Sequence, residues 1–271
     1  MATIDLPNGT HLHYEVTGEG PALLALAPGG LLSRAQLWIH REDGRPRGLV
    51  DPVHAFSARF KVITVDQRNT GGSHAPITAH DGWDEYAQDN LQLLDALGIE
   101  RCHVLGACIG PSFALKMISL APQRFMSAVL QQPIGKTAEN LELRRASFQT
   151  WVKTLHQRNV FPAQNVLRAM EHNLFSTDFV YSVDRQFVSA CTTPLLILPG
   201  DDARHPRVIS EEILSLAPDA QAFEDWQSAA GQLRYATTLE QFFNQHTSSQ
   251  NTSNQNTFNQ SKEQSPPHDF S

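Results

Sequence analysis

The stretch that decides the fold is Cys102-His103-Val104-Leu105-Gly106-Ala107-Cys108-Ile109-Gly110-Pro111-Ser112. Its first residues are typical of a buried β-strand, and residues 109–121 have the pattern of a helix. Between them lies Gly-x-Cys-x-Gly, in which Gly106 and Gly110 allow neighbouring backbone to pass close to a sharp turn. Such a turn would raise the Cys108 side chain above the end of the strand. The N–H groups and positive partial charge of the helix N-terminus would stabilise a thiolate there.

The same alternation of strand and helix extends in both directions from this stretch. Residues 22–27 form a continuous apolar run, typical of a strand buried on both faces, that stops at Pro28-Gly29-Gly30. Asn8-Gly9 predicts a hairpin near the N-terminus. Further strands are expected at 61–65, 126–130, 195–198 and 220–223, and helices at 83–97, 209–216 and around 239–243. Alternating strands and helices predict a mostly parallel sheet, with ligands bound at the carboxyl ends of the strands.

Two segments depart from this alternation. Between residues 136 and 190 apolar residues recur at helix-like intervals without a convincing strand, which predicts a small helical cap or an ordinary extra helical layer. Residues 247–271 are rich in Asn, Gln, Ser and Thr and are expected to be disordered. The predicted organisation is therefore one domain over residues 1–246, with the insertion at 136–190, followed by a tail.

These features resemble the α/β-hydrolase superfamily, whose nucleophile elbow reads Gly-x-Ser-x-Gly; here Cys108 takes the place of the serine. Residues 23–30 resemble the strand that carries the oxyanion loop, with Pro28-Gly29 replacing His-Gly. Residues 65–73 look like the Asp-x-Arg-Gly-x-Gly-x-Ser loop, in which Asp66 and Arg68 are expected to form a structural ion pair. Residues 194–206 (PLLILPGDDARHP) are similar to the strand and loop that present the catalytic acid. The resemblance implies an α/β-hydrolase fold with about eight strands and a small helical cap.

The resemblance also implies roles for individual residues. Cys108 would be the nucleophile, and the backbone N–H groups of Gly30 and Ile109, next to Gly29, would stabilise an oxyanion. Asp202 would be the catalytic acid, with Asp201 as the alternative because the loop spacing allows either.

One expected residue is missing. The family's general base is a histidine shortly after the last strand, but residues 223–230 contain no histidine. His205, three residues after Asp202, lies on a suitable loop and is our candidate base. His103 would lie too far below Cys108, at about 3.3 Å per strand residue. The other candidates are His40, His74, His246 and His268.

The function implied is that of a hydrolase or acyltransferase acting on a small-molecule ester, thioester, lactone or amide through a cysteine. Because a low-pKa cysteine needs less help from a base than a serine does, the missing histidine does not exclude catalysis. Two alternatives remain open: a non-catalytic protein that binds a small ligand where the family's active-site pocket lies, and a non-hydrolytic lyase. In both, Cys108 would be only a small residue retained for folding.

Charge and composition limit the kinds of partner that this protein is expected to bind. The net charge is −7 and no basic patch stands out, which argues against nucleic acid and anionic membrane surfaces. The N-terminus lacks a signal-peptide pattern and no apolar run is long enough to span a membrane, so a cytoplasmic protein is expected. No zinc-type Cys/His spacing and no dinucleotide-binding loop occur, so neither metal nor cofactor is expected. The sequence does not indicate an oligomeric state.

Overall fold

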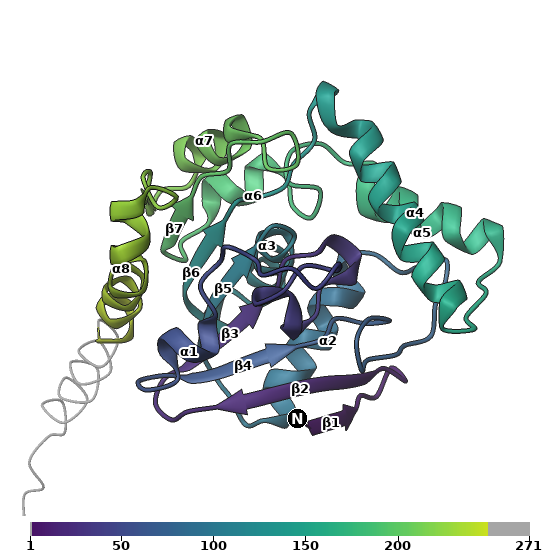
Figure 1. The fold of residues 1–271 in the computed structure, drawn as a ribbon, viewed down its shortest axis with the longest axis horizontal. Helices are drawn as coiled ribbons and strands as arrows, with labels where there is room; N and C mark the ends of the chain where they lie inside the picture. Colours follow the sequence, from purple (N-terminus) through teal and green to yellow (C-terminus); the bar gives the residue numbers. More distant parts are fainter. Residues whose placement is uncertain (1, 249–271) are drawn as a thin grey trace, which may run out of the picture.

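An eight-stranded sheet forms the centre of the protein in this computed structural model, which describes residues 2–248 (Figure 1). The strand order is β1-β2-β4-β3-β5-β6-β7-β8. Only the pairings of β1 with β2 and of β2 with β4 are antiparallel. The mostly parallel sheet of about eight strands is therefore confirmed. The strands are β1 (Ala2–Asp5), β2 (His11–Thr17), β3 (Ala22–Leu26), β4 (Lys61–Val65), β5 (Cys102–Ala107), β6 (Phe125–Gln131), β7 (Leu195–Leu198) and β8 (Ala220–Ala222).

Helices cover both faces of this sheet, and each face has its own apolar core. Successive side chains of β5 point into different cores: Val104 belongs to one core and Leu105 to the other. The Val104 core includes residues from α2 (Trp83–Ala96), α3 (Gly110–Leu120) and α7 (Arg207–Leu216). The Leu105 core includes residues from α1 (Pro52–Phe56) and α8 (Ala229–Ser248). Because β3, β4, β5, β6 and β7 run parallel, their following loops meet at one edge of the sheet.

The segment between β6 and β7 is helical. It contains η4 (Ala138–Asn140), α4 (Leu141–Gln157), α5 (Gln164–Phe175) and α6 (Arg185–Ala190), and no strand. Figure 1 shows α4 and α5 packed together beyond the carboxyl edge of the sheet. Helix α4 contacts η1 (Gly30–Leu32), the turn that follows β3. This segment, hereafter the cap, therefore lies next to the loops where the sequence places the site.

Two expectations need correction: where the tail begins, and the ion pair between Asp66 and Arg68. Helix α8 continues to Ser248, so Thr247 and Ser248 belong to this helix and not to the tail. Thr247 is held there by a 2.8 Å hydrogen bond between its Oγ1 and Nε2 of the buried His103. The rest of the predicted tail, residues 249–271, lies outside the described residues.

The predicted Asp66–Arg68 ion pair is wrong, although both residues hold the loop after β4. Arg68 pairs with Asp81 at 3.2 Å and with Asp89 of α2 at 2.9 Å, and all three side chains are buried. The Asp66 carboxylate instead accepts hydrogen bonds from the backbone N–H groups of Ala35 and Gly72. The acidic partners of Arg68 come from later in the chain, so the local motif could not reveal them.

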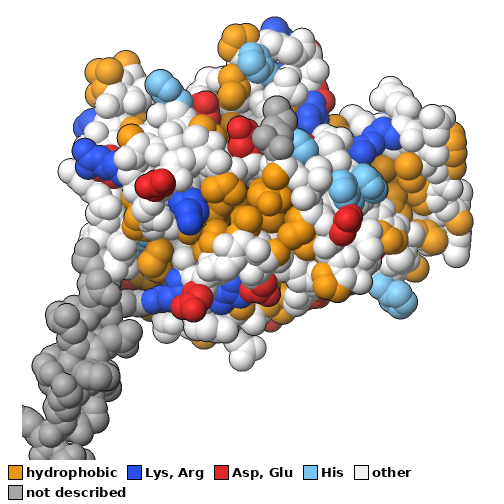
Figure 2. Space-filling model, turned by 90° about the horizontal axis from the view of Figure 1, so that it is seen from below, with side chains coloured by type: hydrophobic (Ala, Val, Ile, Leu, Met, Phe, Trp, Pro, Cys, Tyr) orange, Lys and Arg blue, Asp and Glu red, His pale blue; other side chains and the backbone are white. Residues whose placement is uncertain are grey.

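Other elements complete the chain: η2 (Ala35–Trp38) follows η1, and η3 (Pro122–Arg124) precedes β6. Figure 2 shows one face of the molecule, on which apolar side chains gather near the middle with charged side chains around them. Within residues 2–248, none of the helices has the length and apolar character needed to cross a bilayer.

Candidate active site

Cys108 lies in a strained turn between β5 and α3. Its φ angle is +61°, in the left-handed region that costs a residue with a side chain about 1–3 kcal/mol. Two backbone hydrogen bonds, one to the last residue of β6 and one to the loop after it, stabilise the turn. Cys108 N–H donates to the Gln131 carbonyl at 2.9 Å, and Ile134 N–H donates to the Cys108 carbonyl at 3.3 Å. These hydrogen bonds therefore hold Cys108 in its strained conformation.

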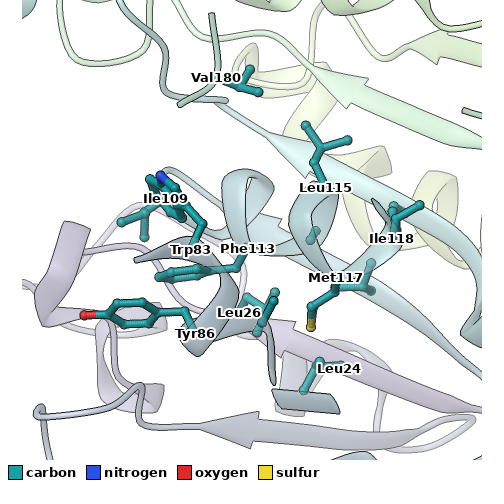
Figure 3. Packing of buried hydrophobic residues seen from close by; sticks show 14 of the residues in the cluster. Leu24, Leu26, Trp83, Tyr86, Ile109, Phe113, Leu115, Met117, Ile118 and Val180 are labelled. Atoms are coloured by element: carbon teal, nitrogen blue, oxygen red, sulfur yellow. The ribbon is translucent and has the colours of Figure 1, made fainter. Parts of the chain in front are cut away.

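The two glycines of the motif are required by packing, as the sequence predicts. A Cβ on Gly106 would collide with the backbone of Gly110, and a Cβ on Gly110 would lie 2.6 Å from the Leu26 carbonyl oxygen of β3. Beneath the turn, α3 is anchored by aromatic contacts: Phe113 stacks on Tyr86 of α2 with ring centroids 5.1 Å apart (Figure 3). The turn therefore rests on a closely packed base.

The loop after β7 brings Asp202 and His205 together. Nδ1 of His205 lies 3.0 Å from both carboxylate oxygens of Asp202. The same carboxylate accepts from the backbone N–H groups of Arg204 at 2.7 Å and His205 at 2.9 Å. Gly200 makes this geometry possible, because a Cβ there would collide with the His205 backbone. Asp202 therefore fixes the direction of the imidazole and leaves Nε2 available on the other side.

The His205 imidazole and the Cys108 thiol act on each other's ionisation. Nε2 of His205 is buried and has no partner with regular hydrogen-bond geometry among the described residues, but the imidazole and the thiol interact closely enough to shift each other's pKa. Burial opposes ionisation of Cys108, yet His205, the Gly29 backbone N–H and Arg144 outweigh it and lower the thiol pKa to about 6. Burial likewise lowers the pKa of His205, but Cys108 and Asp202 raise it more. Each group thus favours the charged form of the other.

The pKa of Asp202 is lowered as well. Partial burial raises it, but the side-chain hydrogen bond and charge of His205, together with the backbone N–H groups of His205 and Arg204, outweigh burial. The Asp202 side chain is 56% exposed, so its interaction with His205 is partly screened by solvent. Asp202, not Asp201, makes the recorded contacts with His205.

The oxyanion loop approaches Cys108 through Gly29. The Gly29 backbone N–H lowers the pKa of the Cys108 thiol. Gly29 and Gly30 have φ angles of 123° and 62°, and a Cβ on Gly30 would lie 2.9 Å from Ser147 Oγ of α4. Ile109 directly precedes α3, so its N–H has no carbonyl partner within that helix. The roles of Gly30 and Ile109 as oxyanion donors stay predictions.

The other histidines are placed elsewhere. Both ring nitrogens of His103 are engaged, Nδ1 by Ser127 Oγ and Nε2 by Thr247 Oγ1. His74 stacks on His11 with ring centroids 4.6 Å apart. His40 pairs through its backbone with Pro46, and His246 packs against Phe242 of α8. His268 lies outside the described residues.

Arg144, a residue of the site, escaped the sequence analysis. It lies on α4, is 8% exposed, and its charge favours the Cys108 thiolate. The sequence did hold a signal: residues 144, 148, 151 and 155 follow one helical face, and the last three are Phe, Trp and Leu. An arginine in line with an apolar stripe is expected to be buried.

No cluster that could hold a metal ion occurs among residues 2–248: no three His, Cys, Asp or Glu side chains are grouped suitably. A cavity of about 510 Å³ lies between β2, η2 and α1, and its lining includes Tyr14, Trp38 and Val53. Cys108 is not among the residues that line this cavity.

Known proteins share the fold and parts of the sequence. A protein from Variovorax paradoxus named as a carbamate hydrolase, RutD, is 34% identical over 119 residues, 44% of this chain and 41% of that one. A protein of the same name from Stutzerimonas stutzeri is 29% identical over 171 residues, 62% of this chain and 58% of that one. The chain therefore matches only about half the length of these curated relatives.

Solved structures match over most of their length. The meta-cleavage product hydrolase CumD from Pseudomonas fluorescens IP01 has a TM-score of 0.64 at 18% identity, covering 90% of this chain and 98% of that one. The enol-lactonase from Burkholderia xenovorans LB400 has a TM-score of 0.62 at 19% identity, covering 89% and 99%. At this identity they show the fold alone. A model of the alpha/beta hydrolase fold family matches residues 42–253, well over half of the chain. The protein therefore belongs to the alpha/beta hydrolase fold family.

Proposed function

We propose that this protein is a hydrolase that cleaves the ester, thioester or lactone bond of a small molecule, with Cys108 as nucleophile. The observation that carries the proposal is the strained Cys108 facing a His205 whose other nitrogen is held by Asp202. This is the nucleophile–base–acid arrangement of hydrolases. The curated relatives named as carbamate hydrolases support hydrolysis of an acyl-type bond, and carbamates belong in the substrate panel.

The first half of the reaction forms an acyl-enzyme. At neutral pH the lowered pKa of Cys108 and the raised pKa of His205 favour a thiolate–imidazolium pair. The thiolate attacks the carbonyl carbon, a C–S bond forms, and the carbonyl oxygen becomes an oxyanion near the Gly29 N–H. The C–O or C–S bond to the leaving group then breaks, and His205 Nε2 gives its proton to that group. Cys108 is left as an acyl thioester.

The second half releases the acid. Neutral His205 now accepts a proton from water as the water oxygen attacks the thioester carbonyl. The tetrahedral intermediate collapses, the C–S bond breaks and Cys108 leaves as a thiolate beside the imidazolium. Another nucleophile in place of water would make the same site an acyltransferase. The cap, which contacts η1, would decide which nucleophile enters.

Intact-protein mass spectrometry tests this proposal. The protein is mixed with activated esters, thioesters, a lactone and an aryl carbamate, next to Cys108→Ala and the matched control Cys191→Ala, which alters a buried cysteine away from the site. We expect a transient mass increase in the parent and in Cys191→Ala, with product release, and none in Cys108→Ala. Absence of adduct and product in a folded parent across the panel would refute the proposal and favour the ligand-binding or lyase alternative. Turnover that survives in Cys108→Ala would refute the cysteine nucleophile.

A further inference from the structure

Arg144 is a buried cation without an acidic partner. Among residues 2–248 no ion pair joins it to a carboxylate, its Nε is buried without a hydrogen-bond partner, and one terminal nitrogen donates to the Arg204 carbonyl. Arg68 shows the usual solution, since it is also buried but pairs with two aspartates. A buried charge is costly unless it is paired. The charge of Arg144 acts on the Cys108 thiolate, but no carboxylate of the described residues contacts its guanidinium, so a direct anionic partner is expected from outside the chain.

The surroundings of Arg144 place it at the reacting centre. The carbonyl that it binds belongs to the residue directly before His205. Its guanidinium lies 5.8 Å from the centroid of the Tyr181 ring, and its charge acts on Cys108. Arg47, from the loop before α1, also interacts electrostatically with Cys108 and has a buried, unpartnered Nε. Two cations from separate segments thus act on the same sulfur.

A recess on the cap, of which Arg144 is one wall, also has an excess of positive charge. A cavity of about 390 Å³ is lined by Arg144 and Tyr181 together with residues of α4 and α5. Its lining includes three arginines (Arg144, Arg145 and Arg168) and one acid, Glu171. An excess of positive charge in such a recess attracts anions, although the protein as a whole carries a net charge of −7.

We propose that Arg144 binds a carboxylate of the substrate, so that the enzyme acts on esters, thioesters or lactones that carry a free carboxylate near the scissile bond. This rests on the proposed hydrolase function. A carboxylate matches one unpaired buried guanidinium in charge and can accept from its free N–H groups, as arginine–carboxylate pairs do. Held there, the carboxylate would position the neighbouring carbonyl carbon near Cys108 Sγ.

A matched pair of substrates tests the proposal. Values of kcat/KM are measured for 4-nitrophenyl acetate and for its anionic analogue 4-nitrophenyl hemisuccinate. The variants are Arg144→Gln, Arg144→Lys and the control Lys153→Gln, which removes an exposed positive charge from the same helix. We expect the parent and Lys153→Gln to prefer the hemisuccinate roughly 10- to 100-fold, the effect of one charge-assisted hydrogen-bonded contact. Arg144→Gln should lower kcat/KM for the hemisuccinate far more than for the acetate, so that the preference is lost, and Arg144→Lys should keep part of the preference.

The outcomes separate this proposal from the hydrolase function on which it rests. Turnover of both esters without preference in the parent would overturn the role of Arg144 and leave Cys108 catalysis intact. An equal fall for both esters in Arg144→Gln would make Arg144 a residue that only positions the His205 loop. No acylation by either ester would overturn both proposals. Calorimetry with succinate gives a readout independent of turnover: we expect binding to Cys108→Ala and none to the folded double variant Cys108→Ala/Arg144→Gln, and equal binding to both would overturn the proposal.

Discussion

Replacing His205 by glutamine should move the ionisation of Cys108 to much higher pH. In the parent the thiol pKa is lowered from its ordinary 9.0 to about 6, against the effect of burial, and His205 is the largest contributor to that lowering. Without the imidazole, burial remains and the helix N-terminus offers only part of the compensation. The pKa of Cys108 should therefore return to about 9 or above, a change of roughly three pH units.

The assay is the rate of reaction of Cys108 with a small neutral disulfide reagent as a function of pH. In the parent about nine in ten thiols are ionised at pH 7, and in His205→Gln only about one in a hundred. A thiolate of higher pKa is also more nucleophilic, by roughly 20-fold for three units. The rate at pH 7 should consequently fall only about fourfold, while the plateau at high pH rises. The midpoint of the pH profile is therefore the quantity to measure.

Other cysteines and histidines of the chain provide the controls for this assay. Burial raises the pKa of Cys102 to about 12 and also raises that of Cys191, so neither should react at the parent's midpoint. His246→Gln, on α8, should leave the midpoint near 6, and Cys108→Ala gives the background rate. A His205→Gln profile with the parent's midpoint would show that His205 does not control the thiol, and the assigned base would be wrong.

Three further changes test other parts of the structure. Asp202→Asn should lower kcat/KM about 10- to 100-fold, less than the roughly 10⁴-fold effect of a fully buried acid because this side chain is 56% exposed; unchanged kinetics would remove Asp202 from the site. Gly110→Ala should lower the free energy of unfolding by about 3 kcal/mol or more, because its Cβ would lie 2.6 Å from the Leu26 carbonyl; denaturant titration would contradict this if the midpoint did not move. His103 is buried with a pKa lowered to about 3, mainly by burial, so the unfolded chain binds a proton at this histidine below its ordinary pKa of 6.5 while the folded chain does not. Stability should fall by about 2 kcal/mol from pH 6.5 to pH 5, and His103→Gln should remove that part of the acid sensitivity; equal pH slopes in the two proteins would contradict the assignment.

The sheet and the turn could be predicted from local sequence. Short apolar runs stopped by glycine or proline, such as the run ending at Pro28, are the direct signature of strands buried on both faces. Gly106 and Gly110 are readable because only a residue without Cβ fits where two backbones nearly touch. The apolar runs and the contact of Gly106 with Gly110 depend on residues close together in the chain, so the order of the residues contains them. The contact of Gly110 with Leu26 of β3 needs the folded sheet.

The partners of charged groups could not be read in this way. The motif suggested that Arg68 pairs with Asp66, but the fold provides Asp81 and Asp89 from later in the chain. The burial of Arg144 was equally hidden, although its place on the apolar face of α4 was a signal. An ion pair depends on which segments meet in space, and a local sequence motif does not specify which distant segments will meet.

His205 shows both what the sequence determined and what only the tertiary structure decided. The sequence by itself determined that residues 223–230, directly after the last strand, contain no histidine and that His205 stands three residues after Asp202, close enough for a local contact. Only the tertiary structure decided that the loop after β7 turns toward the end of β5, so that the ring held by Asp202 faces Cys108. The physical reason is that parallel strands bring their carboxyl ends together, and residues almost one hundred positions apart then share one site.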